Sequence, residues 1–135
     1  MNLCTFCRII AGEITSVRLA ENEQAIAFLD IRPVNAGHAL IIPRRHVASF
    51  VELTEEEGAS IFRLVQDVGR AMKAVLPGCA GLSLSAADGE AAGQEVLHAH
   101  FHVIPRSEGD GFGWRRFGQR VDHASLETVA SVIRS

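Results

Sequence analysis

Residues 97–104 read Leu97-His98-Ala99-His100-Phe101-His102-Val103-Ile104, and polar and apolar side chains alternate from Leu97 to Val103. Because a β-strand places successive side chains on opposite faces, this alternation predicts a strand from about Val96 to Ile104. Its apolar residues, Leu97 among them, are expected to face the core, and its three imidazoles to share the other face. Three of the six histidines of the chain stand in this short run, which favours a functional role over an ordinary solvent-exposed strand face.

The spacing along this strand predicts that the three histidines have different tasks. A rise of about 3.3 Å per residue puts His98 and His102 roughly 13 Å apart along the backbone, whereas zinc–nitrogen bonds are about 2 Å long. All three therefore cannot easily surround one ion. His98 and His100 alone could share a metal, which leaves a hydrolase with a catalytic zinc ion as a rival interpretation.

A second group of metal-binding residue types stands near the start of the chain, where residues 4–7 read Cys4-Thr5-Phe6-Cys7. Two thiolates at this spacing can fill two corners of a tetrahedral zinc site. Since the sequence has no second Cys-x-x-Cys, the remaining ligands are expected to be histidines. A thioredoxin-like redox pair and two unligated cysteines are the alternatives, although a redox pair normally follows a strand.

Two apolar segments before the histidine run predict paired strands, one over residues 24–30 and one over residues 38–43. The stretch between them contains Pro33, Asn35 and Gly37, which are residue types of turns. A hairpin or meander is therefore expected here. A further strand is expected over residues 81–85.

The clearest predicted helix begins at Thr54, whose hydroxyl can cap it while Glu57 completes a capping box. Apolar residues then recur at three- and four-residue spacing until Pro77-Gly78 ends the helix. A short C-terminal helix is expected over residues 125–133. Because helices do not alternate regularly with strands, the pattern predicts one α+β domain over residues 1–135, around a mostly antiparallel sheet of about five strands.

Composition limits the classes of partner. The chain has 135 residues, a formal net charge of −3 and a pI near 6.0, so bulk attraction to nucleic acid or to anionic membranes is not expected. Its apolar runs are far shorter than the roughly 20 residues of a membrane-spanning helix, and no signal peptide is recognisable. We expect a cytoplasmic protein whose three cysteines do not form a disulfide framework.

The combined pattern closely resembles the histidine-triad, or HIT, family of nucleotide hydrolases and transferases, in its small Hint-like branch. The resemblance covers nearly the whole chain. It is carried by the Cys-x-x-Cys motif with residues 8–14, by Ala27-Phe28-Leu29-Asp30-Ile31, by Gly37-His38-Ala39-Leu40-Ile41-Ile42-Pro43-Arg44-Arg45-His46, and by Gly93-Gln94 leading into His98-x-His100-x-His102-Val103-Ile104-Pro105-Arg106. The resemblance implies a HIT-like fold, with the antiparallel sheets of two subunits joined in a homodimer.

The resemblance also implies a structural zinc ion. In zinc-containing members with two cysteines, the metal is held by both thiolates, by the histidine after the Ile-Pro segment and by the first histidine of the triad. These ligands correspond to Cys4, Cys7, His46 and His98. Four protein ligands leave no open position for an activated water, so such a site is structural rather than catalytic.

For the nucleotide site, the resemblance implies that His100 is the nucleophile, which carries a transient nucleotidyl group, and that His102 donates to phosphate oxygens. Asp30 corresponds to the acid that accepts hydrogen bonds from the ribose, and the amide of Gln94 is expected to reach the phosphate or the leaving group. The apolar positions around the base, for which ordinary core packing is the alternative, correspond to Phe6, Ile9, Phe28 and Ile31. The expected enzyme is a purine nucleoside phosphoramidase or a nucleotidyl hydrolase.

Two positions depart from the family pattern. Ala87 stands where Hint-like members usually carry an asparagine, and Glu95 stands where some carry a serine. A carboxylate at Glu95 would suit a basic leaving group such as an amine.

Two functions are alternatives to the hydrolase. One is a nucleotide-binding or scaffold protein with little activity. The other is a nucleotidyl transferase, although that branch has longer chains and a His-Pro-His motif. The segment around Trp114 is equally expected to determine substrate specificity or to be an ordinary surface turn.

Overall fold

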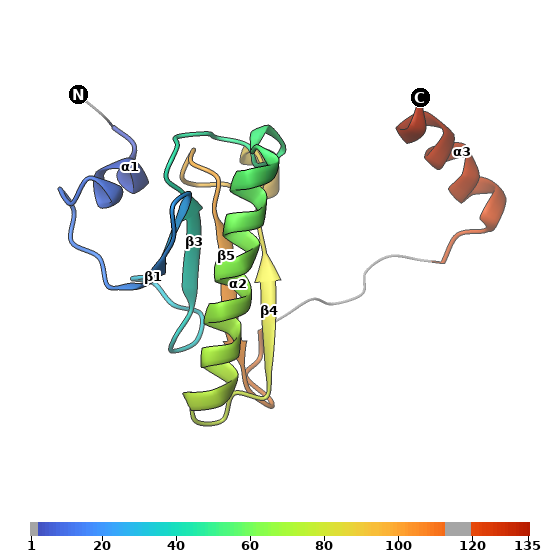
Figure 1. The fold of residues 1–135 in the computed structure, drawn as a ribbon. Helices are drawn as coiled ribbons and strands as arrows, with labels where there is room; N and C mark the ends of the chain where they lie inside the picture. Colours follow the sequence, from blue (N-terminus) through green and yellow to red (C-terminus); the bar gives the residue numbers. More distant parts are fainter. Residues whose placement is uncertain (1–2, 113–119) are drawn as a thin grey trace.

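The centre of the fold is an antiparallel sheet with the strand order β1-β2-β3-β5-β4 (Figure 1). The computed structural model describes residues 3–112 and 120–135. Within them the strands are β1 (Arg18–Glu21), β2 (Ala25–Leu29), β3 (Ala39–Pro43), β4 (Gly81–Ser85) and β5 (Phe101–Arg106). The helices are α1 (Thr5–Ile10), α2 (Glu55–Val75) and α3 (His123–Arg134), with 3₁₀ turns η1 (Phe50–Glu52) and η2 (Glu90–Ala92). The predicted α+β class and five-stranded antiparallel sheet are confirmed.

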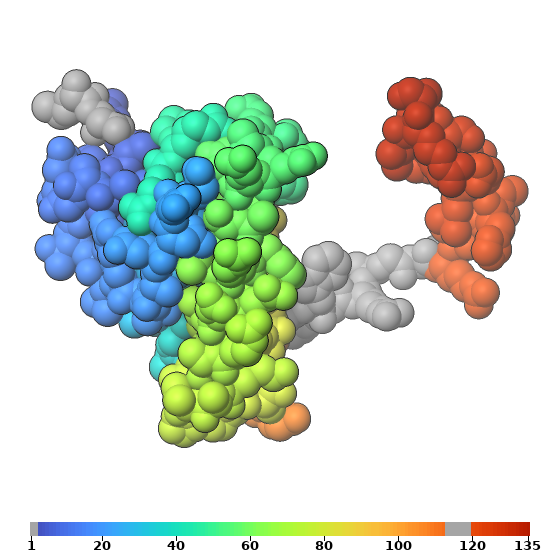
Figure 2. Space-filling view, viewed as in Figure 1, coloured from blue at the N-terminus to red at the C-terminus, as the bar shows by residue number. Residues whose placement is uncertain are grey.

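Helix α2 covers one face of the sheet (Figure 1), and its green and yellow-green atoms form the front of the molecule in Figure 2. Ala25, Ala27 and Ala39 are small strand residues that are fully buried in this layer of the core, beside the larger Ile41 and Val103. Small side chains let the helix backbone approach the sheet closely. The apolar stripe of α2 fills the remaining space with Ile61, Leu64, Val68 and Met72.

The opposite face of the sheet carries larger side chains and packs against α1. This second layer of the core contains Phe6, Ile9, Ile26, Phe28, Leu40 and Ile42. On β5, His102 lies directly opposite Leu40, and paired residues on neighbouring strands point to the same face. The side chain of His102 therefore lies on the α1 face and not under α2.

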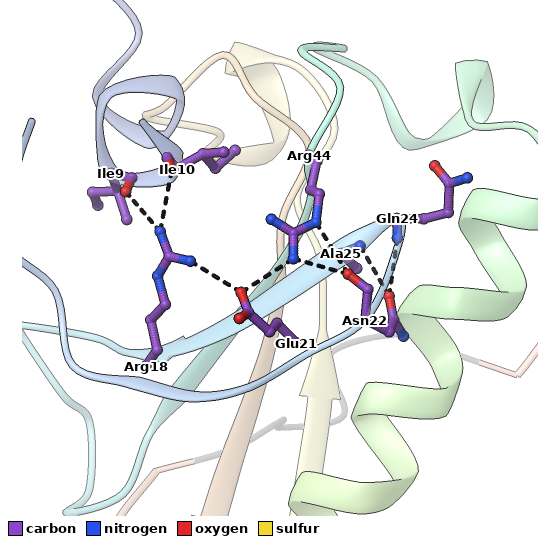
Figure 3. Close-up of polar contacts among 8 residues, drawn as sticks. All are labelled: Ile9, Ile10, Arg18, Glu21, Asn22, Gln24, Ala25 and Arg44. Carbon is purple, nitrogen blue, oxygen red and sulfur yellow. Dashed lines mark hydrogen bonds and ion pairs between the residues drawn. The ribbon is translucent and has the colours of Figure 1, made fainter. Parts of the chain in front are cut away.

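Polar contacts fasten α1 to the edge of the sheet, and Figure 3 shows them in close-up. Arg18 of β1 donates from Nη2 to the carbonyl oxygens of Ile9 and Ile10, at 3.1 and 3.2 Å. Its Nη1 donates to Glu21, which also accepts a hydrogen bond from Arg44 at 3.1 Å. The bond from Arg44 is the main reason why the pKa of Glu21 lies below its ordinary value. These contacts help to position the Cys-x-x-Cys motif, which lies at the start of α1.

The histidine-bearing strand is shorter than its alternation predicts. β5 begins at Phe101, so His98 and His100 lie in the irregular segment before it. Leu97, which was expected to face the core, is 61% exposed, whereas the side chain of His98 is completely buried. The prediction that the three imidazoles share one face of a regular strand is therefore wrong.

The reason lies in the neighbouring strand. The pairing of β3 with β5 ends where Ile41 meets Phe101, and Pro43 has no N–H group with which to continue the ladder. The backbone N–H of Ala99 donates instead to the carbonyl oxygen of Val47, at 2.7 Å, in the loop after β3. The segment before β5 consequently bends away from strand geometry.

The C-terminal helix α3 spans the residues predicted for it, but none of its residues is buried. Figures 1 and 2 show it standing apart from the sheet. Trp114, in the segment expected to determine specificity or to form a surface turn, lies outside the described residues. Among the residues that the structure describes, no helix combines the length and apolar character needed to cross a membrane.

Candidate active site

A cavity of about 550 Å³ on the α1 side of the sheet brings most of the predicted substrate and catalytic residues together. This volume is typical of small-molecule sites, which measure about 300–1,000 Å³. The predicted residues that line it are Phe6, Ile9, Phe28, Asp30, Ile31, His100 and His102. Glu95 lines it as well, whereas Gln94 and Ala87 do not.

The backbone fixes the tautomer of His100. Its Nδ1 lies 2.7 Å from the carbonyl oxygen of His98, and a carbonyl can only accept a hydrogen bond. Nδ1 therefore carries the proton, and Nε2 of the neutral ring keeps its lone pair. Because His100 lines the cavity, its ring has the form that nucleophilic attack requires at the place where a substrate can bind.

The structure adds His38, to which the sequence pattern assigned no separate role. The N–H of Val34 donates to Nδ1 of His38 at 3.0 Å, so the proton of this ring lies on Nε2. That Nε2 lies 2.9 Å from Nδ1 of His102 and donates to it. His102 consequently carries its own proton on Nε2 and can act as a donor there.

A sequence signal for His38 exists. It stands two residues before Leu40, which pairs with His102, and the period of two along a strand places His38, Leu40 and Ile42 on one face. Knowledge of the β3–β5 register would therefore have predicted the contact between His38 and His102. Register cannot be read from the alternation within a single strand.

Asp30, His38 and His102 also place three potential ligand atoms within 4.8 Å of one another. A metal on Nε2 of His38 would need that nitrogen unprotonated, which moves the ring proton to Nδ1. There it would face the N–H of Val34. The backbone therefore favours a hydrogen-bonded pair of imidazoles over a metal ion at this position.

Burial keeps the two hydrogen-bonded imidazoles neutral. Desolvation lowers the pKa of His102 to about 4, and the neighbouring His100 and His38 contribute further lowering. Burial also lowers the pKa of His38, although the carboxylate of Asp30 opposes this effect. Near neutral pH, His102 therefore offers an uncharged N–H donor to a ligand.

The four predicted metal ligands lie together beside this site, with all ligand atoms of Cys4, Cys7, His46 and His98 within 4.8 Å of one another. The Sγ atom of Cys7 is 3.3 Å from Nδ1 of His46 and 3.6 Å from Nδ1 of His98. The Sγ atom of Cys4 is 3.4 Å from Nδ1 of His98. A tetrahedral zinc ion separates its sulfur and nitrogen ligands by about 3.5 Å. This donor set fits a closed zinc site.

His98 connects the metal-ligand group to the candidate nucleophile. Its Nε2 donates to the carbonyl oxygen of Pro43 at 2.8 Å, which leaves Nδ1 unprotonated on the side of the cysteine sulfurs. Its own carbonyl oxygen holds Nδ1 of His100. A displacement of His98 would therefore also disturb the ring of His100.

The apolar residues predicted around a base have two roles in the structure. Phe6, Ile9 and Phe28 are buried in the α1 layer of the core and also line the cavity. The ring of Phe6 stands edge-on to that of His100, with 5.1 Å between the centroids. Ile31 differs from them, since it lines the cavity but is 90% exposed. Core packing and contact with a ligand are therefore compatible roles for three of these residues.

Gln94 does not have the position predicted for it. Its Oε1 accepts a hydrogen bond from the N–H of Gly89 at 2.7 Å, and its Nε2 donates to the carbonyl oxygens of Ala48 and Val96 at 2.8 and 3.1 Å. The residue is buried. Because its amide is engaged by backbone groups, Gln94 holds the loop over residues 88–96 and does not extend into the cavity.

Comparisons with known proteins agree with this arrangement. Residues 11–109 match the family model described as the HIT domain. The adenosine 5′-monophosphoramidase of Schizosaccharomyces pombe is 42% identical over 114 residues, which cover 82% of this chain and 82% of that protein. The crystal structure of a HIT family member from Bacillus subtilis has a TM-score of 0.88 and 39% identity, covering 98% of this chain and 96% of that chain. A Zn-bound histidine triad family protein from Mycobacterium smegmatis has a TM-score of 0.77 and 33% identity, covering 96% and 97%.

Proposed function

Because the chain belongs to the HIT domain family, a family of nucleotide hydrolases and transferases, we propose that it hydrolyses nucleotide conjugates through a covalent intermediate on His100. The observation that carries the proposal is the pair of ring nitrogens in one cavity. His100 offers an unprotonated Nε2, His102 offers an Nε2–H donor, and their ring centroids are 5.2 Å apart. The similarity to an adenosine 5′-monophosphoramidase supports purine nucleoside phosphoramidates as the substrate class.

In the first step, the lone pair on Nε2 of His100 forms a bond to the α-phosphorus while the bond between phosphorus and the leaving nitrogen breaks. The leaving amine keeps the electron pair of that bond and takes up one proton from the solvent. Nδ1 of His100 stays protonated against the carbonyl oxygen of His98, which stabilises the positive charge that develops on the ring.

In the second step, water attacks the phosphorus and releases one proton, while the bond to His100 breaks and returns its electron pair to Nε2. The products are a nucleoside monophosphate and the free amine. In both steps, His102 donates to the non-bridging phosphate oxygens, where negative charge shifts in the transition state. His38 acts as a positioning residue, because its Nε2–H fixes the tautomer of His102.

Nucleoside recognition is assigned to the remaining cavity walls. One carboxylate oxygen of Asp30 accepts the backbone N–H of Arg32 at 2.8 Å, which leaves lone pairs of the carboxylate available to the ribose hydroxyls. The apolar surface for the base is proposed to come from Phe6, Ile9, Phe28 and Ile31. Gln94 is proposed to position the loop over residues 88–96, because backbone groups engage its amide.

We also assign a structural zinc ion to Cys4, Cys7, His46 and His98. The donor geometry and the Zn-bound relative from Mycobacterium smegmatis support this assignment. When bound, zinc supplies a rigid link between α1 and the segment that carries His98. Since all four tetrahedral positions are taken by protein atoms, this site favours a structural role over the catalytic-zinc alternative.

The homodimer is proposed to form through β4, which is an edge strand of the sheet within the described residues. Leu82 and Leu84 on this strand are 38% and 49% exposed, and Phe62 of α2 is 53% exposed. An unpaired strand edge beside exposed apolar side chains is a typical site of association between chains. Light scattering at the concentration of the assays measures the molar mass, which is expected to be that of two chains.

The substitution His100→Ala tests the proposed function. It is expected to reduce the hydrolysis of adenosine 5′-phosphoramidate by at least about 10⁴-fold, because no other unprotonated ring nitrogen in the cavity is placed for attack. Nucleotide binding and the thermal unfolding midpoint should change little. Turnover at the parent rate would contradict the mechanism. Tight nucleotide binding without turnover in the unsubstituted protein would favour the binding-protein alternative.

A further inference from the structure

Asn35, in the turn before β3, joins this turn to a distant part of the chain. Its Nδ2 donates to the carbonyl oxygen of Pro105 at 2.9 Å and to Oδ2 of Asp110 at 2.8 Å. These partners are 70 and 75 residues away along the sequence. Because both can only accept a hydrogen bond, the nitrogen of the amide must face them. The half-buried side chain of Asn35 therefore uses both of its donors to hold the turn.

The acceptor Asp110 is itself held in place. Nε and Nη2 of Arg106 donate to its two carboxylate oxygens, at 2.8 and 2.5 Å. The backbone N–H groups of Ser107 and Phe112 also donate to it, each at 3.2 Å. The hydrogen bonds from Arg106 are the main cause that lowers the pKa of Asp110 far below its ordinary value. Asn35 thus binds an ionised acceptor whose position is set by the loop after β5.

The turn that Asn35 begins is tight and closely packed. The N–H of His38 donates to the carbonyl oxygen of Asn35 at 3.0 Å, and Gly37 has a φ of +99°. A positive φ at the third position of a turn favours glycine. A Cβ at Gly37 would also lie 2.7 Å from Leu76 and 3.3 Å from Pro105. The turn is therefore packed between the end of α2 and β5.

This turn positions the ring of His38. Val34, the residue before Asn35, provides the N–H that donates to Nδ1 of His38 at 3.0 Å. On the other side of the ring, Nε2 of His38 donates to Nδ1 of His102 at 2.9 Å. A displacement of Asn35 would move the backbone N–H that sets the tautomer of His38. The proton of His102, which depends on that tautomer, would then no longer be fixed on Nε2.

We propose that Asn35 is a positioning residue for the candidate active site, and that Asp110 acts through it. The proposal rests on the proposed hydrolase function and extends it to residues outside the cavity, since neither Asn35 nor Asp110 lines it. The amide of Asn35 holds the turn, and the turn orients His38. His38 in turn keeps the Nε2–H of His102 directed at the phosphate.

The substitution Asn35→Ala removes both side-chain donors and keeps the backbone of the turn. It is expected to lower kcat for adenosine 5′-phosphoramidate about 10-fold and to change KM less than about twofold, as is typical when an orienting partner is lost. Nitrogen-15 NMR should show His102 as a mixture of tautomers instead of the Nε2–H form alone. Asn35→Asp has a similar shape but no donor, so it should lose at least as much.

Asn22→Ala is the matched control. Asn22 is also a half-buried asparagine of a turn, and its Nδ2 donates to the carbonyl oxygen of Ser60 at 2.9 Å. It lies between β1 and β2 and does not line the cavity. Both alanine variants are expected to unfold at a lower temperature than the parent. Only Asn35→Ala should change kcat and the tautomer of His102, measured well below both unfolding midpoints.

Asp110→Ala tests the second part of the proposal. It is expected to lower kcat only about threefold, because Asn35 keeps its hydrogen bond to Pro105. Added to Asn35→Ala, it should cause no further loss of kcat, since residues that act through one contact are not additive. Losses that multiply in the double variant would overturn the role of Asp110.

The outcomes separate this proposal from the one on which it rests. Parent values of kcat and the parent tautomer in Asn35→Ala would overturn the positioning role and leave the hydrolase function standing. Equal changes of kcat in Asn35→Ala and Asn22→Ala would do the same. If the unsubstituted protein does not hydrolyse the phosphoramidate, the hydrolase function fails, and the NMR comparison still decides whether Asn35 orients His102.

Discussion

The ring protons of four histidines in this chain are positioned by hydrogen bonds to defined partners. Carbonyl oxygens fix His98 and His100, a backbone N–H fixes His38, and His38 in turn fixes His102. The same arrangement suits each ring to the role that we propose for it: ligand, nucleophile, orienting donor and phosphate donor, in that order. The contact between His38 and His102 can be tested by a substitution, because here a side chain, and not a backbone group, sets the tautomer of His102.

The substitution His38→Phe is expected to lower kcat about 10- to 100-fold with little change in KM, as is typical when an orienting partner is lost. Without the donor on Nδ1, His102 is free to move its proton to that nitrogen, so fewer molecules present Nε2–H to the phosphate. Nitrogen-15 NMR of the imidazoles checks this directly. The parent should show His102 as the Nε2–H tautomer, and the Phe variant a mixture.

His38→Gln serves as the matched control, since its amide can still donate a hydrogen bond. It should recover part of kcat and part of the Nε2–H signal. A purely structural role for His38 would instead give equal losses in both variants, in parallel with their stability.

Several site residues could be predicted from sequence, and the exceptions have physical causes. The alternation in residues 97–104 and the surrounding motifs predict His100 and His102, and both line the cavity. The role of His38 cannot be predicted from the sequence pattern, because its contact with His102 depends on strand register. For Gln94, the resemblance implies a contact with the phosphate or the leaving group, whereas its amide binds backbone groups of its own loop and of Ala48.

Among the elements, the long helix α2 and the apolar strands β2, β3 and β4 could be predicted from the sequence, whereas α1 and β1 could not. α2 begins after Thr54 as its capping box indicates, and both hydrogen bonds of the box are present. α1 and β1 have only 6 and 4 residues, too few to establish a period. β5 starts later than predicted because its pairing with β3 ends at Ile41. Local patterning thus identifies an element, whereas its neighbours determine its ends.

The start of α2 also contains a buried charge that can be tested. Glu57 is 3% exposed and accepts hydrogen bonds from Arg45 at 2.8 and 2.9 Å and from the N–H of Thr54 at 2.9 Å. The bonds from Arg45 are the largest cause that lowers the pKa of Glu57 from 4.5 to about 2. Because the pKa is lower in the folded state, ionised Glu57 stabilises the fold above pH 4.5, and this contribution disappears as the pH falls towards 2.

Glu57→Gln is therefore expected to lower the free energy of unfolding at pH 7 by about 2 kcal/mol, through the loss of charge-assisted hydrogen bonds. The deficit relative to the parent should shrink between pH 4.5 and pH 2, as the parent carboxylate becomes protonated. Urea unfolding at several pH values measures both quantities. Glu56→Gln, at an exposed neighbouring position, should change stability little. A deficit for Glu57→Gln that is the same at pH 7 and pH 3 would refute this account.

At the scale of the whole molecule, the two faces of the sheet have different partners: one packs against α2, and the other packs against α1 and carries the candidate site. Small residues such as Ala25 and Ala27 admit α2 on one face, and large ones such as Ile26 and Phe28 meet α1 on the other. The site forms on the second face, where α1 brings the cysteines beside the histidine segment. This division could be anticipated from residue types once the strands were known. The proposed homodimer has no such signal in the pattern of the strands and rests on the family resemblance and on the exposed residues of β4 and α2.

The central claim, a nucleotidyl group on His100, is tested most directly by trapping the intermediate. The protein is mixed with excess adenosine phosphoramidate, quenched with alkali within milliseconds, and digested for mass spectrometry. We predict an adenylyl group on the peptide containing His100, formed and consumed at rates that account for turnover, and absent from the His100→Ala variant. Turnover without any adduct, or an adenylyl group on His102, would contradict the mechanism.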